Sequence, residues 1–379
     1  MAKKKICFVV AVPITAQAFL HDHIEALSKE YSVYLVANIH DDVDVEGLAL
    51  SGWHSIGIKR GISFWNDFKS ICQTYQYFRT MRFDVVHSVT PKAGLVTAIA
   101  GRLALVRHRI HIFTGQVWVT RRGLMRWLLK SIDRLIAKMD NHILVDGNSQ
   151  RSFLIKERVL KDGQAEVFHK GSISGVNADR FVPDAQARKE IRSQIGIKDD
   201  VLTFIFLGRL NRDKGIGELL EAFNRLINEK GKVFLLLVGH DEDNYISKLS
   251  EFQSIEDGVN FYYYGLTSHP EKILNAGDVF VLPTYREGFG TSVLEAACIG
   301  LPCICSDAYG VLDAYVEGET GLRCQVGNSD SLYNCMKQMC ESPQLVKKMG
   351  ERSRQRAIRD YNGARLTECW VKFYRKILE

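Results

Sequence analysis

No stretch of the sequence is apolar for long enough to cross a bilayer. A membrane-spanning helix needs roughly 18 to 20 consecutive apolar residues, and no window of the 379-residue chain approaches that length. The opening residues, MAKKKICFVVAV, place three lysines before an apolar run, as a signal peptide does, but the run is short and no small-residue cleavage site follows it. We therefore expect a buried first strand there and a chain that works in the cytoplasm.

The sequence also lacks cysteines at metal-binding spacings. Its nine cysteines are scattered, and Cys303 and Cys305 alternate along one predicted strand. An odd number of unpaired cysteines favours a reducing compartment. The acidic loop that contains Asp42 and Asp44 has the Asp-x-Asp form of a transferase metal motif, but nothing around it continues that pattern. We expect no bound metal and no other cofactor.

There is no strong net charge, only a formal +6 that is unevenly placed. Residues 1–180 hold 25 Lys and Arg against 16 Asp and Glu, so the excess of positive charge belongs to the first half. Such asymmetry suggests that the first half meets an anionic partner.

Short apolar runs alternate with helical patterns along the whole chain. Continuous apolar strands separated by helices indicate parallel sheets that are covered on both faces. The fold class is therefore α/β, with two doubly wound, Rossmann-like domains that face each other across a cleft. We place the domains at 1–175 and 176–360, and we expect a last helix at about 360–379 to return to the first domain. The ten expected strands are KICFVVAV, SVYLVAN, DVVHSV, RIHIFT, HILVDG, LTFIFLG, VFLLLVG, NFYYYG, VFVLP and PCICSD.

Two glutamates stand eight positions apart around a glycine turn. Glu287 lies in the loop after the strand VFVLP, and Glu295 lies about one turn into the following helix. The N–H groups at a helix N-terminus favour an anion, and carboxylates accept hydrogen bonds from sugar hydroxyls. The alternative is a pair of surface glutamates beside an ordinary turn.

A basic loop follows the strand LTFIFLG. Arg209 and Lys214 lie in it, with Gly208 and Gly215 beside them. Two cations with flexible glycines at the carboxyl end of a strand suit a diphosphate. A solvated basic loop is the alternative.

A basic amphipathic helix is predicted within residues 119–139. Its cations recur every four positions, with leucines and isoleucines on another side, which is typical of a helix that lies on an anionic membrane surface. The alternative is a core-packed helix with a solvated cationic face. The aromatic residues do not interleave with the charges and no nucleic-acid motif is present, so we expect no nucleic-acid partner. The five cations are Arg122, Arg126, Lys130, Arg134 and Lys138.

With these motifs in place, residues 200–325 resemble the donor domain of retaining, GT-B fold glycosyltransferases of family 4. The matching stretches are GRLNRDKG, the strand ending LLLVG, the Tyr-Gly after the next strand, and AGDVFVLPTYREGFGTSVLEAACIGLPCICSD, which carries the Glu-x7-Glu signature. The first half is similar, more loosely, to the acceptor domains of bacterial polysaccharide and O-antigen transferases. The resemblance covers nearly the whole chain.

The resemblance implies a role for each matching residue. Arg209 and Lys214 would hold the donor diphosphate and, with Glu287 at the donor sugar, form the catalytic group. Glu295 would bind the nucleotide ribose. The remaining donor-binding residues would be Gly208, Gly265, Leu266, Gly288, Phe289, Gly290 and Thr291.

The chain departs from the family on the acceptor side. Where many members carry a His-Gly that touches the donor, this sequence has Thr114 and Gly115. His111, two positions earlier, completes the acceptor-side candidates, although we favour a structural role for it. His21 and His23 stand in a first loop that lacks the usual glycines. Either could assist on the acceptor side, but we expect both to be helix-surface residues.

Together these features predict a retaining, metal-independent transferase. The donor would be a UDP-linked hexose or N-acetylhexosamine, and the acceptor a glycan on a polyprenyl diphosphate, in O-antigen or capsule synthesis. The enzyme would be peripheral on the cytosolic face of the inner membrane. The alternatives are a GT-B UDP-sugar 2-epimerase, which needs no acceptor, and a nucleotide-sugar-binding protein without catalytic activity.

Overall fold

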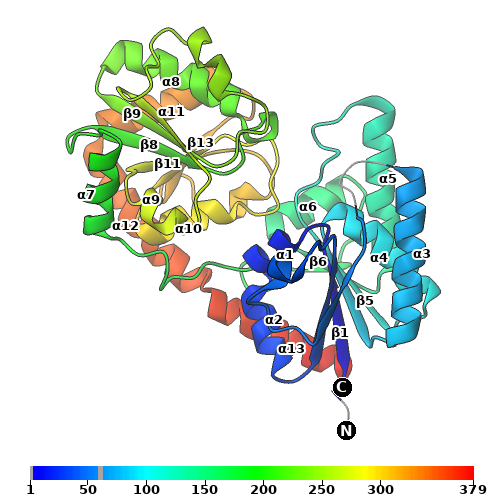
Figure 1. Ribbon diagram of the computed structural model, residues 1–379. Coiled ribbons are helices and arrows are strands. Elements are labelled where there is room, and N and C mark those ends of the chain that lie inside the picture. Colours follow the sequence, from blue (N-terminus) through cyan, green and yellow to red (C-terminus); the bar gives the residue numbers. More distant parts are fainter. Residues whose placement is uncertain (1–2, 59–62) are drawn as a thin grey trace. The chain divides into compact units, whose positions relative to one another are not determined.

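The chain passes twice between two structural units in the computed structural model, which describes residues 3–58 and 63–379. Unit 1 comprises the chain up to Ser174 together with Gly363–Glu379, and unit 2 comprises Gly175–Asn362. Each unit contains one parallel sheet covered by helices (Figure 1). No helix in the described part of the chain is both long and apolar enough to span a membrane.

Unit 1 is built on a seven-stranded sheet in the order β3-β2-β1-β4-β5-β6-β7, and all its neighbouring pairs are parallel. The order reverses between β1 and β4. In open parallel sheets, ligands bind beyond the carboxyl ends of the strands at this reversal. The strands are β1 (Lys5–Val9), β2 (Ser32–Ala37), β3 (Gly52–Ser55), β4 (Val85–Val89), β5 (His108–Phe113), β6 (His142–Val145) and β7 (Ala165–Glu166).

The helices of unit 1 divide between the two faces of this sheet. Because parallel crossovers are right-handed, the helices between β3 and β7 share one face, and the early helices take the other. The first group is α3 (Phe64–Met81), α4 (Pro91–Leu103), α5 (Gly123–Met139) and α6 (Asn148–Lys156); α3, α4 and α5 lie side by side (Figure 1). The second face has α1 (Pro13–Phe19), α2 (His21–Ser28) and, after α2, a short turn of helix η1 (Asp42–Val45).

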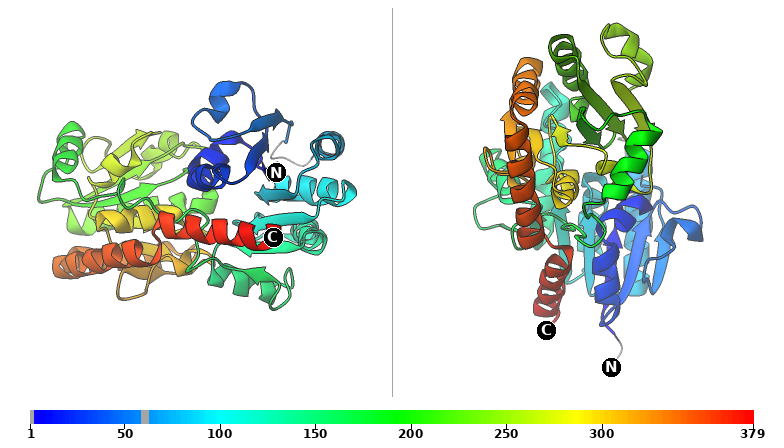
Figure 2. Two further views of the ribbon diagram at one scale, coloured as in Figure 1. Left: turned by 90° about the horizontal axis from the view of Figure 1, so that it is seen from below. Right: turned by 90° about the vertical axis from the view of Figure 1, so that its left-hand side faces the viewer.

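The last helix, α13 (Gly363–Leu378), belongs to unit 1 and packs against α2. Its Trp370 is fully buried between two histidine rings, His23 at 4.4 Å and His87 at 5.0 Å between centroids. His23 also bonds Thr367 Oγ1 at 2.9 Å. The end of α13 and the start of β1 lie at the same end of the unit in both views (Figure 2). His23 is therefore a core residue that anchors the returning helix, and the expectation of a helix-surface residue was wrong for it.

Unit 2 is built on a six-stranded parallel sheet in the order β10-β9-β8-β11-β12-β13, with its reversal between β8 and β11. Its central strands are wholly buried, which explains their continuous apolar sequences. All ten strands expected from the sequence are present in the two units. The strands are β8 (Leu202–Leu207), β9 (Val233–Val238), β10 (Phe261–Gly265), β11 (Val279–Leu282), β12 (Cys303–Ser306) and β13 (Gly321–Cys324).

The helices of unit 2 begin and end at clear local signals. Asp184 caps α7, its carboxylate accepting two backbone N–H bonds at 2.9 Å, and Asn328 caps α11. Gly231 and Gly300 end α8 and α10 in the left-handed region. The helices are α7 (Ala185–Gln194), α8 (Ile216–Lys230), α9 (Pro270–Leu274), α10 (Thr291–Ile299), α11 (Ser329–Glu341) and α12 (Pro343–Asp360), with short turns η2 (Arg212–Lys214), η3 (Ile246–Glu251) and η4 (Val311–Asp313).

Candidate active site

The two sequence motifs of unit 2 meet at the point where the strand order reverses. The basic loop follows β8 and the glutamate loop follows β11, and β8 and β11 are paired neighbours on either side of the reversal. Both loops leave the carboxyl ends of their strands, which is where open parallel sheets bind ligands. The topology therefore brings the basic loop and the glutamate loop to one edge of one sheet.

The basic loop and the glutamate loop are fastened directly to each other. The backbone oxygen of Asp213 accepts from the Tyr285 N–H at 2.8 Å and from Thr284 Oγ1 at 2.9 Å. The Asp213 carboxylate pairs with Arg286 at 2.7 Å. Gly215 lies under the second loop with φ +72°, where an added Cβ would stand 2.1 Å from the Pro283 backbone oxygen. No other residue type fits this contact, so Gly215 fixes how closely the loops approach.

Lys214 and Glu287 form an ion pair across this junction. Their side chains are only 19% and 14% exposed, so the pair is partly withdrawn from water. Arg209, at the start of the basic loop, is half-exposed and pairs with Glu242 of the loop after β9 at 3.0 Å. Asn211 donates to the same Glu242 carboxylate at 2.7 Å. Arg209 and Lys214 thus lie at the reversal, and each is paired with a carboxylate. An anionic ligand would replace that carboxylate or bind the cation together with it.

The glutamate loop ends at the N-terminus of α10. Gly290 precedes the helix with φ +87°, in the region that favours glycine. In the described part of the chain, no acceptor is bonded to the backbone N–H groups of residues 288–292. The first turn of α10 carries no acidic side chain. Free N–H groups and the helix dipole therefore favour an anion at this position.

The side chain of Phe289 does not belong to the ligand-facing surface. It is 2% exposed and packs against Tyr361 with ring centroids 5.3 Å apart. Any contact of Phe289 with a ligand would come from its backbone, while its ring holds the loop to the core.

Glu295, one turn into α10, is half-buried, and among the described residues none donates a hydrogen bond to its carboxylate. Burial raises the pKa of Glu295 to about 7; Arg180 opposes this shift, and the Glu271 carboxylate adds to it. A carboxylate that is partly withdrawn from water without a donor is costly. Hydroxyl groups of a bound ligand would supply the missing donors.

Arg180 is a site residue that the sequence analysis did not single out. Its guanidinium donates to Glu271 at 2.8 Å and to the backbone oxygen of Ser268 at 3.0 Å, so it links the segment before α7 to the loop after β10. The same loop begins with Gly265 and Leu266, and Leu266 is exposed. The electrostatic effect of Arg180 on Glu295 places these elements around one locus.

The acceptor-side histidine proposed in unit 1 is a core residue. His111 is 1% exposed on β5, its Nδ1 bonds Ser88 Oγ at 2.8 Å, and a Cβ at Gly94 would stand 2.5 Å from its ring. Burial lowers the pKa of His111 to about 3, so the ring is neutral at physiological pH. This packing agrees with the structural role favoured for His111, because its ring fills the space between β5 and α4 and is not exposed for a direct acceptor contact.

Thr114 and Gly115 do lie at the carboxyl end of β5 and are half-buried. The Thr114 backbone oxygen accepts from the Gln150 side chain at 2.6 Å. The structure thus places them at an edge that a ligand of unit 1 could approach, and leaves their role as a proposal.

The cationic stripe of α5 is largely engaged within unit 1. Arg126 and Lys130 pair with Glu157, the residue after α6, at 3.0 and 2.6 Å, and Arg134 donates to the Arg158 backbone oxygen at 2.9 Å. Three of the five cations expected on a membrane-facing side are thus tied to the residues that follow α6, and the membrane-facing role of the stripe stays a prediction. Arg122 and Lys138 remain exposed.

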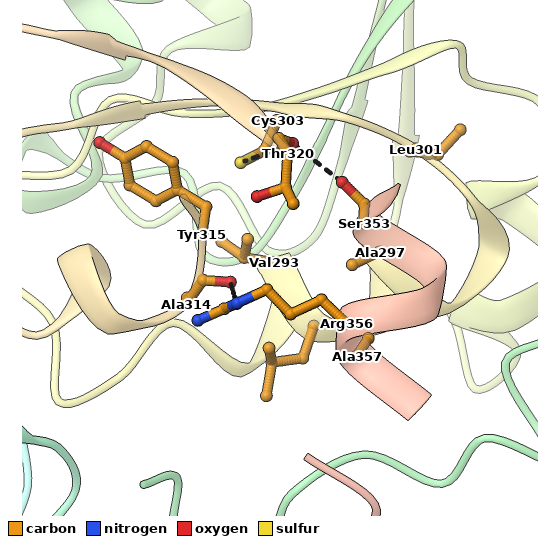
Figure 3. Close-up of a pocket in the computed structure, with 11 residues that line it drawn as sticks. Val293, Ala297, Leu301, Cys303, Ala314, Tyr315, Thr320, Ser353, Arg356 and Ala357 are labelled. Atoms are coloured by element: carbon orange, nitrogen blue, oxygen red, sulfur yellow. Dashed lines mark hydrogen bonds between the residues drawn. The ribbon is translucent and has the colours of Figure 1, made fainter. Parts of the chain in front are cut away.

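An interior cavity lies between α10 and α12, away from the two loops (Figure 3). Its volume is about 10 Å³, which is room for about one water molecule. Two of its polar lining residues are already hydrogen-bonded: Arg356 donates to Ala314 O at 2.7 Å, and Ser353 donates to Thr320 O at 2.9 Å. The cavity is too small for a nucleotide, and the site remains at the sheet edge.

Solved structures share this fold across nearly the whole chain. The chain matches Anabaena Alr3699/HepE in complex with UDP-glucose with a TM-score of 0.80 at 15% identity, over 98% of this chain and 99% of that one. It matches WaaG, a glycosyltransferase involved in lipopolysaccharide biosynthesis, with a TM-score of 0.74 at 14% identity, over 98% and 99% of the two chains. The two Rossmann-like units are therefore those of the GT-B fold.

Sequence comparison gives the class of activity. Residues 187–356 match the family described as Glycosyl transferases group 1. The chain is similar to the capsular polysaccharide biosynthesis glycosyltransferase CapM of Staphylococcus aureus, at 26% identity over 86% of this chain and 85% of that protein. It is also similar to the Escherichia coli UDP-Gal:alpha-D-GlcNAc-diphosphoundecaprenol alpha-1,3-galactosyltransferase, at 27% identity over 80% and 78%. The chain is a glycosyltransferase whose second unit is a group 1 domain.

Proposed function

We propose that the chain transfers a hexose or N-acetylhexosamine from a UDP-sugar to a glycan on a polyprenyl diphosphate, with retention of anomeric configuration and without a metal. The observation that carries this proposal is the cluster at the β8/β11 reversal. Lys214, Glu287 and Arg209 stand there beside the free N–H groups at the start of α10. Cations and amides suit the diphosphate, and the carboxylate suits the sugar hydroxyls.

The reaction would begin as the bond between the anomeric carbon and the diphosphate oxygen lengthens. Lys214, Arg209 and the N–H groups of residues 288–292 would stabilise the charge that develops on the departing diphosphate. Glu287 would hold donor-sugar hydroxyls, and Glu295 would accept hydrogen bonds from the ribose. Three positive groups of this kind supply the stabilisation that a divalent cation provides in other transferases.

The acceptor hydroxyl would attack the anomeric carbon from the face that the diphosphate leaves. Its oxygen forms the new glycosidic bond, and its proton passes to the leaving phosphate oxygen. Release of UDP completes the exchange. This route needs no enzyme base, which fits the burial of His111 and its low pKa.

The acceptor class is supported by relatives and not by a site on this chain. The E. coli relative is named for a diphosphoundecaprenol acceptor, as is an N-acetylgalactosaminyltransferase of Campylobacter jejuni that is 23% identical over 79% of this chain. We extend that class to this chain and place the enzyme on the cytosolic face of the membrane. O-antigen or capsule synthesis is the corresponding process.

The test is a transfer assay with the full chain in EDTA. UDP-galactose, UDP-glucose and their N-acetyl counterparts are offered with an undecaprenyl-diphosphate-linked monosaccharide, and products are analysed by mass and by the proton coupling of the new anomeric centre. We expect one donor to give an α-linked disaccharide, and Lys214→Met to reduce the rate by about 10²–10³-fold. Lys232→Met, at an exposed lysine of the same unit, is the matched control.

Four results would contradict the proposal. A product with inverted anomeric configuration would contradict the retaining mechanism. If activity is lost in EDTA and restored by divalent ions, the enzyme depends on a metal, which would contradict the proposal. Conversion of the UDP-sugar without acceptor would identify an epimerase, and donor binding with no turnover on any acceptor would identify a binding protein.

A further inference from the structure

Three large aromatic side chains lie exposed in the first turns of α3. Phe64, Trp65 and Phe68 are 82%, 86% and 63% exposed. Aromatic residues of this size dominate cores and interfaces. A single exposed apolar residue is common on a protein surface, but a cluster of them is uncommon. Other residues of α3, such as Phe78 at 1% exposure, are buried in the core. The helix therefore has a buried apolar side and, separately, a cluster of aromatic residues that is exposed.

The first turns of α5 expose a second apolar group. Leu124 and Trp127 are 78% and 61% exposed, and Met125 is also exposed. Leu124 and Trp127 are three positions apart and so are neighbours on the helix surface, and both stay exposed although Arg126 and Lys130 of the same helix pair with Glu157.

The two groups lie at the same edge of unit 1. The sheet is parallel, α3 follows β3 and α5 follows β5, so both helices begin at the carboxyl edge of the strands. Helix α4 lies between α3 and α5 and packs against both (Figure 1). We call the exposed apolar residues of these two helix starts the aromatic edge: Phe64, Trp65, Phe68, Leu124, Met125 and Trp127.

The charges around the aromatic edge are positive. Lys69, Arg121 and Arg122 are exposed beside it. Asp67, the acid in the first two turns of α3, is paired with Lys92 at 2.6 Å and is 18% exposed. The first two turns of α5 contain no acid. The surface thus combines exposed aromatics with unopposed cations.

These charges decide between two occupants. A second copy of the chain in a twofold arrangement would bring the same cations against themselves, which like-charge repulsion disfavours. A bilayer with anionic lipid offers the opposite charge, and tryptophan and phenylalanine are the side chains that settle at the boundary between headgroups and acyl chains.

We propose that the aromatic edge is the membrane-docking surface of this enzyme, with Phe64, Trp65 and Phe68 inserted at the headgroup boundary of a bilayer containing anionic lipid. The inference rests on the proposed function only for its purpose, which is to bring unit 1 to a lipid-linked acceptor. It shares only Arg122 with the cationic stripe expected from the sequence: α3 supplies the insertion, and Arg121 and Arg122 supply the attraction to charge.

The experiment is flotation of the full chain with vesicles of phosphatidylcholine, with and without 30 mol% phosphatidylglycerol. Phe64→Ser, Trp65→Ser and Phe68→Ser are combined in one variant, and because the three side chains are exposed the fold should survive, which unchanged thermal unfolding would verify. Leu103→Ser, an exposed leucine at the opposite end of α4, is the matched control. We expect the triple variant to bind anionic vesicles at least about tenfold more weakly, and the control to bind as the parent does.

A second variant separates insertion from attraction. Arg121→Gln with Arg122→Gln should weaken binding to anionic vesicles and leave the weak binding to neutral vesicles unchanged. The triple variant should keep its rate on an acceptor with a short, water-soluble prenyl chain and lose rate on acceptor in vesicles. Equal flotation of parent and triple variant would overturn the inference, as would a concentration-dependent dimer that the triple variant abolishes. Absence of sugar transfer by a parent that floats normally would instead contradict the proposed function.

Discussion

Glu295 is expected to cost the folded protein stability in exchange for ligand binding. Burial raises the pKa of Glu295 to about 7 from an ordinary value of 4.5. The folded state therefore binds the proton more tightly than the unfolded state, and stability falls as pH rises from about 4.5 to about 7. Glu295→Gln removes the ionisation and keeps the shape of the side chain.

The size of the effect follows from the pKa difference. One pKa unit corresponds to about 1.4 kcal/mol, so the substitution should raise the free energy of unfolding by about 3 kcal/mol at pH 8 and by about 1 kcal/mol at pH 5. These values are upper bounds because the side chain is half-buried and water can relax around it. In a unit of this size, 1 kcal/mol moves the melting temperature by about 2–4 °C.

The assay is thermal unfolding of Glu295→Gln and its parent at pH 5 and pH 8, with UDP affinity measured on the same samples. We expect a higher melting temperature that grows with pH, together with weaker UDP binding. Glu256→Gln, at an exposed glutamate of the same unit, should change neither quantity. A variant that is destabilised at pH 8, or that gains stability and keeps full UDP affinity, would refute the assignment of Glu295 to the ribose.

Three further outcomes are expected. Gly215→Ala should lower the free energy of unfolding by about 2 kcal/mol or more and abolish UDP binding, because its Cβ would collide with the Pro283 oxygen; unchanged denaturation and binding curves would contradict the junction. Lys214→Met should weaken UDP binding measured by calorimetry by about tenfold or more, since it removes a charge-assisted contact and leaves Glu287 unpaired, and equal affinity would refute this. Burial lowers the pKa of His23 to about 4. The neutral ring therefore contributes its full stabilisation above about pH 6.5, and this contribution falls by about 1.4 kcal/mol per pH unit as pH falls toward 4. In denaturation experiments between pH 7 and 5, His23→Gln should lose less free energy of unfolding than the parent does.

Much of the fold could be predicted because buried parallel strands have continuous apolar sequences. VFLLLV and KICFV are of this kind, and both are buried strands in the structure. The three strands that the sequence analysis missed are β3, β7 and β13, all at sheet edges. GWHS in β3 is half-exposed, β7 has two residues, and β13 presents Arg323 to solvent. An edge strand buries too little apolar surface to show a clear pattern.

The candidate site could be predicted only where its residues are close in sequence. Glu287 and Glu295 share one strand-loop-helix segment, so the sequence alone placed both at the carboxyl end of the same strand. The Asp213 contact with the glutamate loop and the Arg180 contact with Glu271 join segments that are far apart. Such contacts depend on the order of the strands in the sheet, and the local sequence pattern does not give that order. The same holds for α5, where the helix was predicted correctly but the ion pair of Lys130 with Glu157, 27 positions further along the chain, was not.

Thermal unfolding of the parent chain in EDTA, with UDP, GDP or ADP added, tests the central claim most directly. A ligand at about 100 times its dissociation constant adds about 2.7 kcal/mol to the free energy of unfolding, a shift of several degrees. We predict a shift with UDP that needs no metal and that one UDP-sugar enlarges. A folded sample that shifts with none of the three nucleotides would contradict a donor site at the β8/β11 reversal, and a shift with GDP alone would contradict the UDP donor.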